Sequence, residues 1–354
     1  MEERILKLDE DKVKVQSEGI ILEKTEQPFE NHSVLNPACI LVDGTTHIVY
    51  RAVSRNEVRS TLGYCTFTDH KIIKRYNYPI LSPEFDYEHR GLEDPRIVLI
   101  DNIYYLTYTA YDGKTALISY AVSTELPHFT KRGLLFPKLL FKEVRSILYG
   151  TECGKLYLDF KEHYIGEKLA DNDPMWLKNM VLFPRKINGK FVLLYRILPG
   201  MHITSCDDLH ELTFDYWKDN LANLENHVLF YPEYPFETHH VAGGCPPIET
   251  KDGWLLIYHS VEKRVGRLVY HACAALLDLD DPRKLISRLD YPLFSPREDW
   301  ERFGVVNNVV FPSGAIVRGD RLFIYYGAAD FMIAAKSVSM TELLAALKSF
   351  IKTN

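Results

Sequence analysis

One arrangement of apolar and polar positions occurs five times along this chain. Each copy is a short apolar run, a polar turn and a second run rich in aromatic residues. The copies read ACILVDGTTHIVYRAV from Ala38, PRIVLIDNIYYLTYTAYDG from Pro95, VLFPRKINGKFVLLYR from Val181, PPIETKDGWLLIYHSV from Pro246 and SGAIVRGDRLFIYYGAAD from Ser313. Their turns carry DG, DN, NG, DG and GD, pairs that tolerate the positive φ angles of hairpin turns. Each copy is therefore predicted to form a β-hairpin.

Further apolar runs follow the hairpins at similar offsets, as in LGYCTFTD, ALISYAVST and YHACAALLDLDDP. The segments NYPILSPE and DYPLFSPRE, ahead of the second and fifth copies, are near-duplicates. Repeated units of three or four strands cannot bury both faces alone, but they can do so by stacking radially around an axis. We therefore predict an all-β fold, a five-bladed β-propeller that forms a single domain over residues 1–354. The alternative is a β-sandwich with fortuitous similarity between its hairpins.

Two segments depart from this repeat. SMTELLAALKSFIK has a Ser/Thr start, a glutamate in its first turn and apolar residues at helical spacing. It predicts a short amphipathic C-terminal helix at about 340–352. Residues at about 125–178 hold the longest insertion, which is expected to form a loop or lid over the site.

Composition narrows the class of protein. The chain is 46% hydrophobic and 25% charged, which is ordinary for a soluble globular protein, and its net charge of −6 comes without a basic patch that would suit nucleic acid. The opening MEERILKLDEDKVKV lacks the apolar core of a secretory signal, so a cytoplasmic location is expected. No apolar run is long enough to span a membrane. The six cysteines have no zinc-type spacing, so free thiols and no metal site are predicted.

Polar residues recur where the first strand of each predicted blade begins, close to the axis. They are Asn36 in the first copy, Glu93, Asp94 and Arg96 in the second, Lys178 and Asn179 in the third, His239 and His240 in the fourth, and Asn307 and Asn308 in the fifth. The second strands also end in polar residues, namely Arg51, Asp112, Arg196, His259 and Asp330. A carboxylic acid beside a ring of cations suits the binding of an anion next to a proton donor.

The segment GLEDPRIV, from Gly91 to Val98, places two adjacent acids before a proline at the start of a central strand. In an isolated E-D-P-R tetrapeptide, the acids would be expected to pair with the arginine or to cap a turn. The position at the axis instead favours a functional role for Asp94.

The motifs GLEDPRIV, VLFPRKINGKFVLLYR, GWLLIYHSV, YHACAALLDLDDP and YYGAAD, in this order, resemble glycoside hydrolase family 130, which contains inverting β-mannoside phosphorylases and related β-mannosidases. The resemblance spans about Asn36 to Asp330. It implies a five-bladed propeller, in agreement with the repeat count, and a phosphorylase that acts on β-mannosides.

The resemblance also implies roles for individual residues, with Asp94 as the general acid. The residues expected to bind the sugar are Asn36, Arg51, Glu93, Arg96, His240 and Asp330. Those expected to bind phosphate are Lys178, Asn179, Arg196, His259 and Tyr270. Lys178 stands where many phosphorylases of the family have arginine, and His240 where lysine is common, so the subfamily and the linkage stay open.

The implied reaction needs no cofactor besides inorganic phosphate as co-substrate. Phosphate would attack the anomeric carbon opposite the leaving group, while Asp94 supplies a proton through a mannose hydroxyl. The products would be α-mannose 1-phosphate and a sugar one unit shorter. The sequence specifies no oligomeric symmetry, so a homo-oligomer is left open.

Three other functions stay open at this point. An inverting β-mannosidase would need a second carboxylate about 6.5–9.5 Å from the acid to activate water, and Glu237 and Glu262 are the candidates. A non-catalytic propeller could bind glycans with its aromatic residues. A five-bladed arabinan-cleaving glycosidase would need an acid and a base on separate blades, and no such pair is evident.

Overall fold

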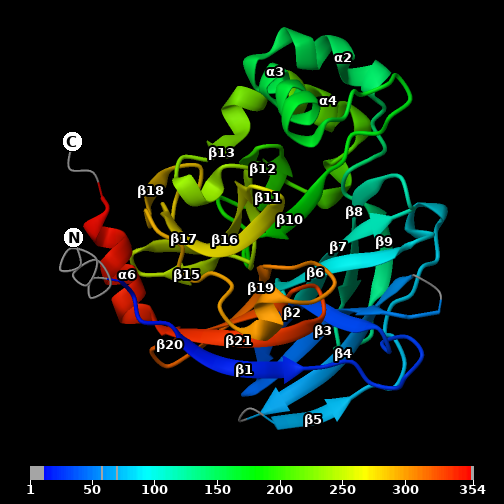
Figure 1. Cartoon of the computed structure of the whole chain (residues 1–354). Helices are drawn as coiled ribbons and strands as arrows, with labels where there is room; N and C mark the ends of the chain where they lie inside the picture. The colour runs from blue at the N-terminus through cyan, green and yellow to red at the C-terminus, as the bar shows by residue number, and fades with distance from the viewer. Residues whose placement is uncertain (1–11, 57–58, 69–70, 352–354) are drawn as a thin grey trace.

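The structure, a computed structural model, describes residues 12–56, 59–68 and 71–351, and strands dominate these ranges (Figure 1). The strands form five antiparallel units, numbered 1 to 5 in chain order. Unit 1 contains β2 (Ser33–Val42), β3 (Thr45–Val53), β4 (Ser60–Thr68) and β5 (Lys71–Arg75); unit 2 contains β6 (Gly91–Ile100), β7 (Ile103–Tyr111), β8 (Ala116–Ser123) and β9 (Thr130–Leu134); unit 3 contains β10 (Lys178–Leu182), β11 (Phe191–Ile197), β12 (Gly200–Cys206) and β13 (Val228–Phe230); unit 4 contains β14 (His240–Gly243), β15 (Ile248–Thr250), β16 (Gly253–Arg264), β17 (Arg267–Leu277) and β18 (Leu285–Arg288); unit 5 contains β19 (Val310–Arg318), β20 (Arg321–Ala328), β21 (Met332–Ser339) and β1 (Gln16–Leu22). The all-β prediction is therefore confirmed.

The five predicted hairpins are present, one in each unit. Their turns use the residues that the sequence singled out: Asp43, Asp101 and Asn188 have φ angles of 47°, 50° and 52°. Asn and Asp tolerate this left-handed region because their short side chains bond to the local backbone. Unit 5 is completed from the other end of the chain, because β1 pairs antiparallel with β21.

The units pack against one another in a closed series. The first strands of units 1 to 4 touch in order, as β2 contacts β6, β6 contacts β10 and β10 contacts β14. Strand β19 of unit 5 contacts β16 and β17 on one side and β2 on the other. Units 1 and 2 also share one continuous sheet, since Ser60 pairs in parallel with Gly91.

A separate hydrophobic cluster lies between each pair of neighbouring units, including units 5 and 1. Strand β11 shows how the sequence produces this. Val192 and Leu194 face the cluster shared with unit 4, while Leu193 and Tyr195 face the cluster shared with unit 2. Successive side chains of a strand point to opposite faces, so a strand buried on both faces needs a continuous apolar run.

Four units contain the same buried polar group: a glutamate ahead of the first strand accepts a hydrogen bond from a tyrosine hydroxyl and pairs with a cation. The groups are Glu30 with Tyr50 and Arg75, Glu88 with Tyr108 and Lys131, Glu237 with Tyr258 and Arg288, and Glu301 with Tyr326 and Lys336. In unit 3 the hydroxyl of Tyr195 donates to Asn220 instead, at 2.6 Å. A buried carboxylate requires such partners because it has lost its water.

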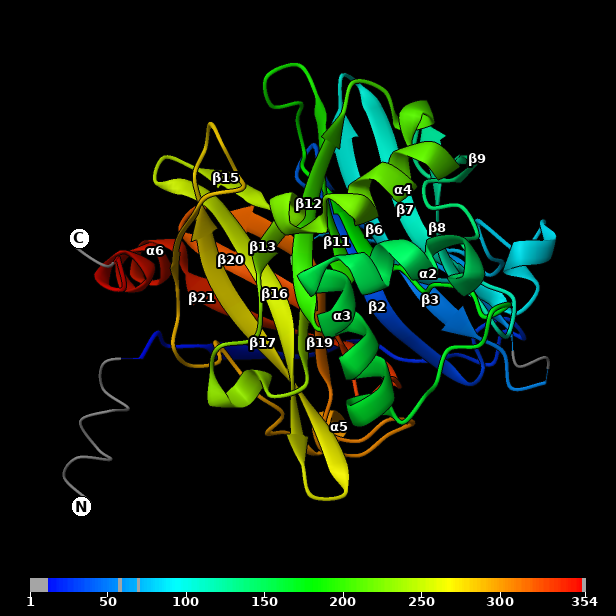
Figure 2. The ribbon, with the colours of Figure 1, turned by 90° about the horizontal axis from the view of Figure 1, so that it is seen from above.

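The longer helices lie at two places (Figures 1 and 2). On one side of the molecule α2, α3 and α4 gather together, and α6 lies at a distant edge, beside β1 and the N-terminal end of the described chain. The helices are α2 (Phe141–Gly150), α3 (Glu152–Asp159), the π-helical turn η2 (Phe160–Ile165), α4 (Phe214–Ala222), α5 (Asp299–Arg302) and α6 (Met340–Ser349), with short 3-10 turns η1 (Asp86–Glu88), η3 (Leu209–Glu211), η4 (Leu224–His227) and η5 (Pro235–Glu237). Within the described ranges, no helix has both the length and the apolar character needed to span a membrane.

The C-terminal helix was predicted correctly. Ser339 caps α6 by accepting a hydrogen bond from the backbone of Glu342, at 3.1 Å, and Leu343 and Leu347 are buried. Residue 352, the predicted end, lies outside the described residues, as do residues 1–11 on which the expectation of a cytoplasmic location largely rests. All six cysteines are free, as predicted, and all but Cys153 are buried.

Candidate active site

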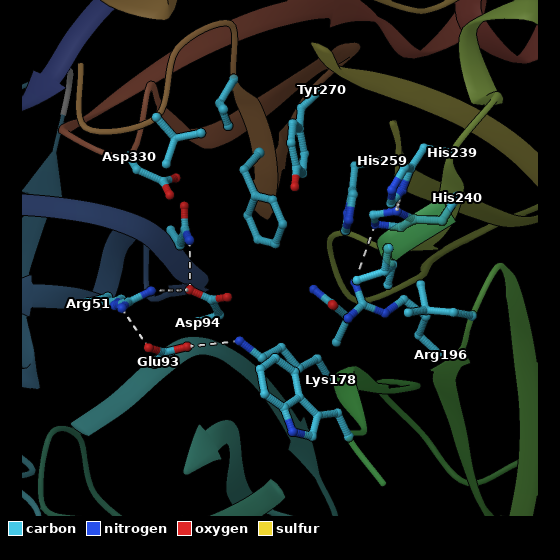
Figure 3. A pocket seen from close by; sticks show the side chains of 18 of the residues that line it. Arg51, Glu93, Asp94, Lys178, Arg196, His239, His240, His259, Tyr270 and Asp330 are labelled. Carbon is cyan, nitrogen blue, oxygen red and sulfur yellow. Dashed lines mark hydrogen bonds and ion pairs between the residues drawn. The ribbon is translucent and has the colours of Figure 1, made fainter. Parts of the chain in front are cut away.

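A cavity of about 350 Å³ opens where the five units converge. Of the residues that the sequence placed at the axis or in the site, all but Arg96, Asp112, Asn307 and Asn308 line the cavity, and Figure 3 shows most of the lining residues pointing into one space. The lining residues that the sequence predicted are Asn36, Arg51, Glu93, Asp94, Lys178, Asn179, Arg196, His239, His240, His259, Tyr270 and Asp330.

A repeated backbone irregularity aims three of these side chains. Asn36, Asp94 and Asn179 have φ angles of 49°, 51° and 60°, and each lies where the pairing of the first and second strands of its unit shifts register. Bulges of this kind redirect a side chain, and the left-handed conformation costs least for Asn and Asp. Positive φ at an equivalent place in three units indicates a functional demand on the backbone.

The acidic side of the pocket is a hydrogen-bonded network. Asn36 Nδ2 donates to Asp94 Oδ1 at 2.7 Å, and Arg51 Nη1 lies 3.5 Å from the same oxygen. Arg51 Nη2 donates to Glu93 Oε1 at 2.6 Å, and Lys178 Nζ donates to Glu93 Oε2 at 3.3 Å. Glu93 is therefore held between two cations, whereas the second carboxylate oxygen of Asp94 has no hydrogen bond from the residues that the structure describes.

The pKa values of Asp94 and Asp330, the two aspartates that line the pocket, are shifted in opposite directions. Burial acts to raise the pKa of Asp94, but Arg51, Lys178 and the hydrogen bond from Asn36 outweigh it, so this pKa is lowered. Burial raises the pKa of Asp330 to about 6. In the pocket without sugar, Asp94 is thus the carboxylate and Asp330 the group that binds a proton more tightly.

The substitution Asp330→Asn is expected to stabilise the protein at high pH. An unfolded Asp has a pKa of about 3.9, so the raised folded-state pKa means that stability falls as pH rises from about 4 through 6. Removing the charge should add on the order of 3 kcal/mol to the free energy of unfolding at pH 8 and almost nothing near pH 4. Asn also tolerates the φ of 51° at this position.

Urea unfolding at both pH values measures this effect. The control is Asp320→Asn, because hydrogen bonds from Ser339 and Thr341 lower the pKa of that exposed carboxyl, and its removal should not stabilise at pH 8. A D330N variant that is less stable than the wild type at pH 8 would contradict the assignment.

The opposite side of the pocket is cationic and aromatic. Arg196 Nη1 lies 3.4 Å from His240 Nε2, and the rings of His259 and Tyr270 stack with centroids 6.1 Å apart. Burial lowers the pKa of both His240 and His259 well below the ordinary value, and Arg196 adds to the effect. These histidines are therefore neutral hydrogen-bonding groups at neutral pH, while Arg196 supplies positive charge.

Several buried polar atoms of the pocket have no hydrogen-bond partner among the described residues. They are Asn36 Oδ1, Arg51 Nε and His259 Nδ1. Unsatisfied buried polar atoms are costly and need an explanation. These atoms belong to residues on both sides of the cavity.

Arg96 has a different place from the one predicted. Its Nε donates to the backbone oxygen of Gly244, and its Nη1 donates to the backbone oxygens of Asp94 and Pro95, each at 3.0 Å. It thus supports the bulge that carries Asp94 and connects unit 2 to unit 4, without lining the pocket. Asp112, Asn307 and Asn308 also lie outside the lining.

The insertion at about 125–178 forms one wall of the pocket, and the sequence did not predict which of its residues would do so. It contributes Tyr157, Lys161, Ile165, Glu167 and Trp176 to the lining of the pocket. The indole Nε1 of Trp176 donates to the backbone oxygen of Lys114 at 3.0 Å, which fixes the ring beside unit 2. The spacing of Phe141, Val144 and Leu148, all buried, was a helix signal within this insertion.

Neither glutamate considered as a hydrolytic base lines the pocket. Glu237 is fully buried and bound to Arg288 and Tyr258 in the repeated polar group. Glu262 pairs with Arg264 and His271, at 2.8 Å and 3.1 Å. Both carboxylates are thus occupied by structural partners.

Replacing Glu237 with Gln is expected to reduce stability and leave catalysis by the folded enzyme unchanged. Loss of Glu237 leaves the buried Arg288 with the exposed Glu233, 3.9 Å away, as its remaining charged partner among the described residues, and loss of one partner of a buried ion pair costs about 3–5 kcal/mol. Urea unfolding and kcat measured at low temperature test this, with Glu262→Gln as the matched, partly exposed control. A stable E237Q variant without turnover would restore Glu237 as a base.

Comparisons with known proteins identify relatives of this chain over most of its length. The family model of glycoside hydrolase family 130, described as beta-1,4-mannooligosaccharide phosphorylase, matches residues 3–349. A 1,2-beta-oligomannan phosphorylase of Thermoanaerobacter sp. (strain X514) is 33% identical over 330 residues, 92% of this chain and 96% of that protein. A beta-1,2-mannobiose phosphorylase of the same organism is 31% identical over 90% of this chain and 94% of its own length.

The fold is also found among solved structures. The beta-1,2-mannobiose phosphorylase of Listeria innocua, solved with beta-1,2-mannobiose, superimposes with a TM-score of 0.70. The match covers 95% of this chain and 99% of that one at 20% identity, so it speaks for the fold alone. Within the described residues, no group of three or more His, Cys, Asp and Glu side chains is arranged to hold a metal ion.

Proposed function

The chain belongs to glycoside hydrolase family 130, and from this membership we propose that it is an inverting β-mannoside phosphorylase. It cleaves a β-mannosidic bond with inorganic phosphate and releases α-mannose 1-phosphate and a shortened sugar. The observation that carries the proposal is the division of the pocket. Asp94 lies on one side, and Arg196 lies on the other with neutral His240 and His259.

The proposed fold is a single five-bladed β-propeller, with units 1 to 5 as its blades. Two features support it: the units contact one another in a series that returns from unit 5 to unit 1, and a hydrophobic cluster lies between each neighbouring pair. Pairing of β1 with β21 completes the fifth blade with a strand from the other end of the chain.

The proposed mechanism assigns the two sides of the pocket to two substrates. Asn36, Arg51 and Asp330 hold the mannosyl unit, and phosphate lies against Arg196 and Tyr270. A phosphate oxygen attacks the anomeric carbon, the glycosidic C–O bond breaks on the opposite face, and the departing oxygen takes a proton that originates from Asp94. Phosphate is already an anion, so no carboxylate is needed to activate it.

Asp94 must be protonated to act as an acid, although its pKa is lowered in the pocket without ligands. A bound sugar excludes more water from the carboxyl, and a phosphate dianion adds negative charge nearby. Both effects raise the pKa of a carboxyl group. Protonation of Asp94 therefore accompanies substrate binding.

The proposed substrates are β-1,2-linked mannosides. The two relatives that cover most of this chain are named for β-1,2-linked mannan and mannobiose. The test is incubation of the protein with β-1,2- and β-1,4-mannobiose, with and without inorganic phosphate, followed by assay of mannose 1-phosphate and free mannose. Mannose 1-phosphate formed only with phosphate supports the proposal, and free mannose released at the same rate without phosphate refutes it.

A further inference from the structure

His239 and His240 are adjacent histidines at the start of β14, and both line the pocket. Their Nδ1 atoms lie 2.6 Å apart, and Nε2 of His240 lies 3.4 Å from Nη1 of Arg196. Figure 3 shows the three side chains together on the cationic side of the pocket. They form one hydrogen-bonded row that ends at a guanidinium group.

The chemistry of the row fixes the position of each proton. A guanidinium has only donors, so Nε2 of His240 accepts from Arg196 and carries no proton. A neutral His240 then has its proton on Nδ1, and this N–H donates to Nδ1 of His239. His239 consequently carries its own proton on Nε2, and both rings are neutral.

The surroundings of the row favour the same state. The ring of Phe160, the first residue of η2, meets the ring of His239 edge-on with centroids 5.0 Å apart. Burial lowers the pKa of His239 to about 4, and Lys263 and Arg196 add to the effect. Burial and Arg196 also lower the pKa of His240.

We propose that His239 is a positioning residue of the phosphate site, which holds His240 in the Nδ1–H tautomer so that His240 Nε2 anchors Arg196. This inference rests on the phosphorylase function proposed above. Without an acceptor at position 239, His240 is free to carry its proton on Nε2. Two donors would then face each other, and the Arg196 guanidinium would lose its anchor.

The first experiment detects the tautomers directly. Heteronuclear NMR of enzyme labelled on its histidine nitrogens, without phosphate or sugar, distinguishes Nδ1–H from Nε2–H rings. His240 is expected as Nδ1–H and His239 as Nε2–H, with signals assigned through the variants His239→Leu and His240→Asn. A proton on Nε2 of His240 would overturn the proposal.

The second experiment follows phosphate. His239→Leu removes the acceptor but keeps an apolar side chain against Phe160, whereas His239→Asn offers Oδ1 as a substitute acceptor. H239L should weaken binding of inorganic phosphate and raise the KM for phosphate roughly five- to tenfold, with little change in kcat or in the KM for the sugar. H239N should restore most of the affinity.

The matched control is His271→Asn, since His271 is a buried histidine of β17 that bonds to Ser295 and Glu262 away from the pocket. It should leave the KM for phosphate unchanged. H239L with wild-type phosphate affinity, or with phosphate and sugar affinity lost together, would overturn the proposal. If the wild type instead releases mannose without phosphate, the proposed function fails, while the tautomers of the ligand-free enzyme still test the role of His239.

Discussion

Asp94→Asn should lower kcat/KM for phosphorolysis of β-1,2-mannobiose about 10²- to 10⁴-fold, the range for loss of a general acid. Asn keeps the backbone conformation, because it tolerates the φ of 51°, and its Oδ1 still accepts from Asn36 Nδ2. The variant therefore removes the titratable proton and, with it, the negative charge 3.5 Å from Arg51, while the backbone and the hydrogen bond from Asn36 are kept. Steady-state release of mannose 1-phosphate measures the loss.

Two controls separate loss of the acid from loss of the fold. Asp112→Asn, outside the pocket, keeps the oxygen that accepts from the backbone of Lys114 and Thr115, and it should retain full activity. A dinitrophenyl β-mannoside has a leaving group that needs no proton, so D94N should lose much less activity on it than on mannobiose. Equal losses on both substrates would speak against Asp94 as the acid.

Arg196→Gln should raise the KM for phosphate by about one to two orders of magnitude, since a hydrogen bond to a charged group contributes about 1.5–3 kcal/mol. The KM for the sugar should change little, because the residues proposed to hold the mannosyl unit lie on the opposite side of the pocket from Arg196. Arg196→Lys should recover part of the affinity, as it keeps the charge but loses the planar pair of donors.

Initial rates over a range of phosphate concentrations at fixed sugar measure this effect. Arg185→Gln is the matched control, because Arg185 pairs with Glu249 at an exposed position at 2.8 Å, outside the pocket. A hydrolase would respond differently. In a hydrolase, R196Q would change the turnover number by the same factor at every phosphate concentration. Such a result would also remove the main support for the phosphorylase.

The hairpins and most of the residues that line the pocket were predictable because their signals are local. The turn at Asp43 needs a residue that tolerates positive φ, and the run around Leu193 needs apolar side chains on both faces. These requirements involve residues within one strand or one turn, so each can be recognised from a short stretch of consecutive residues in the sequence. Asp94 was found for the same reason, since its position relative to the hairpin is set within one unit.

Arg96 and Glu237 show where local patterns stop being informative. Arg96 lies two residues from Asp94, but its partner is the backbone of Gly244 in another unit. Glu237 comes two positions before His239 in the sequence, yet its carboxylate pairs with Arg288, 51 positions away. A polar side chain can bind either a ligand or another part of the protein. Which of the two it binds depends on the groups that tertiary packing places next to it.

Short-range periodicity and turn chemistry in the sequence thus specified five hairpins, the C-terminal helix and the position of Asp94 at the start of the second unit. Packing between distant segments placed β1 beside β21, closed the series of contacts between the units, and brought Trp176 and Lys161 of the insertion over the pocket. The physical reason is that a strand or turn forms from adjacent residues, whereas the pocket exists only where five separately encoded units meet.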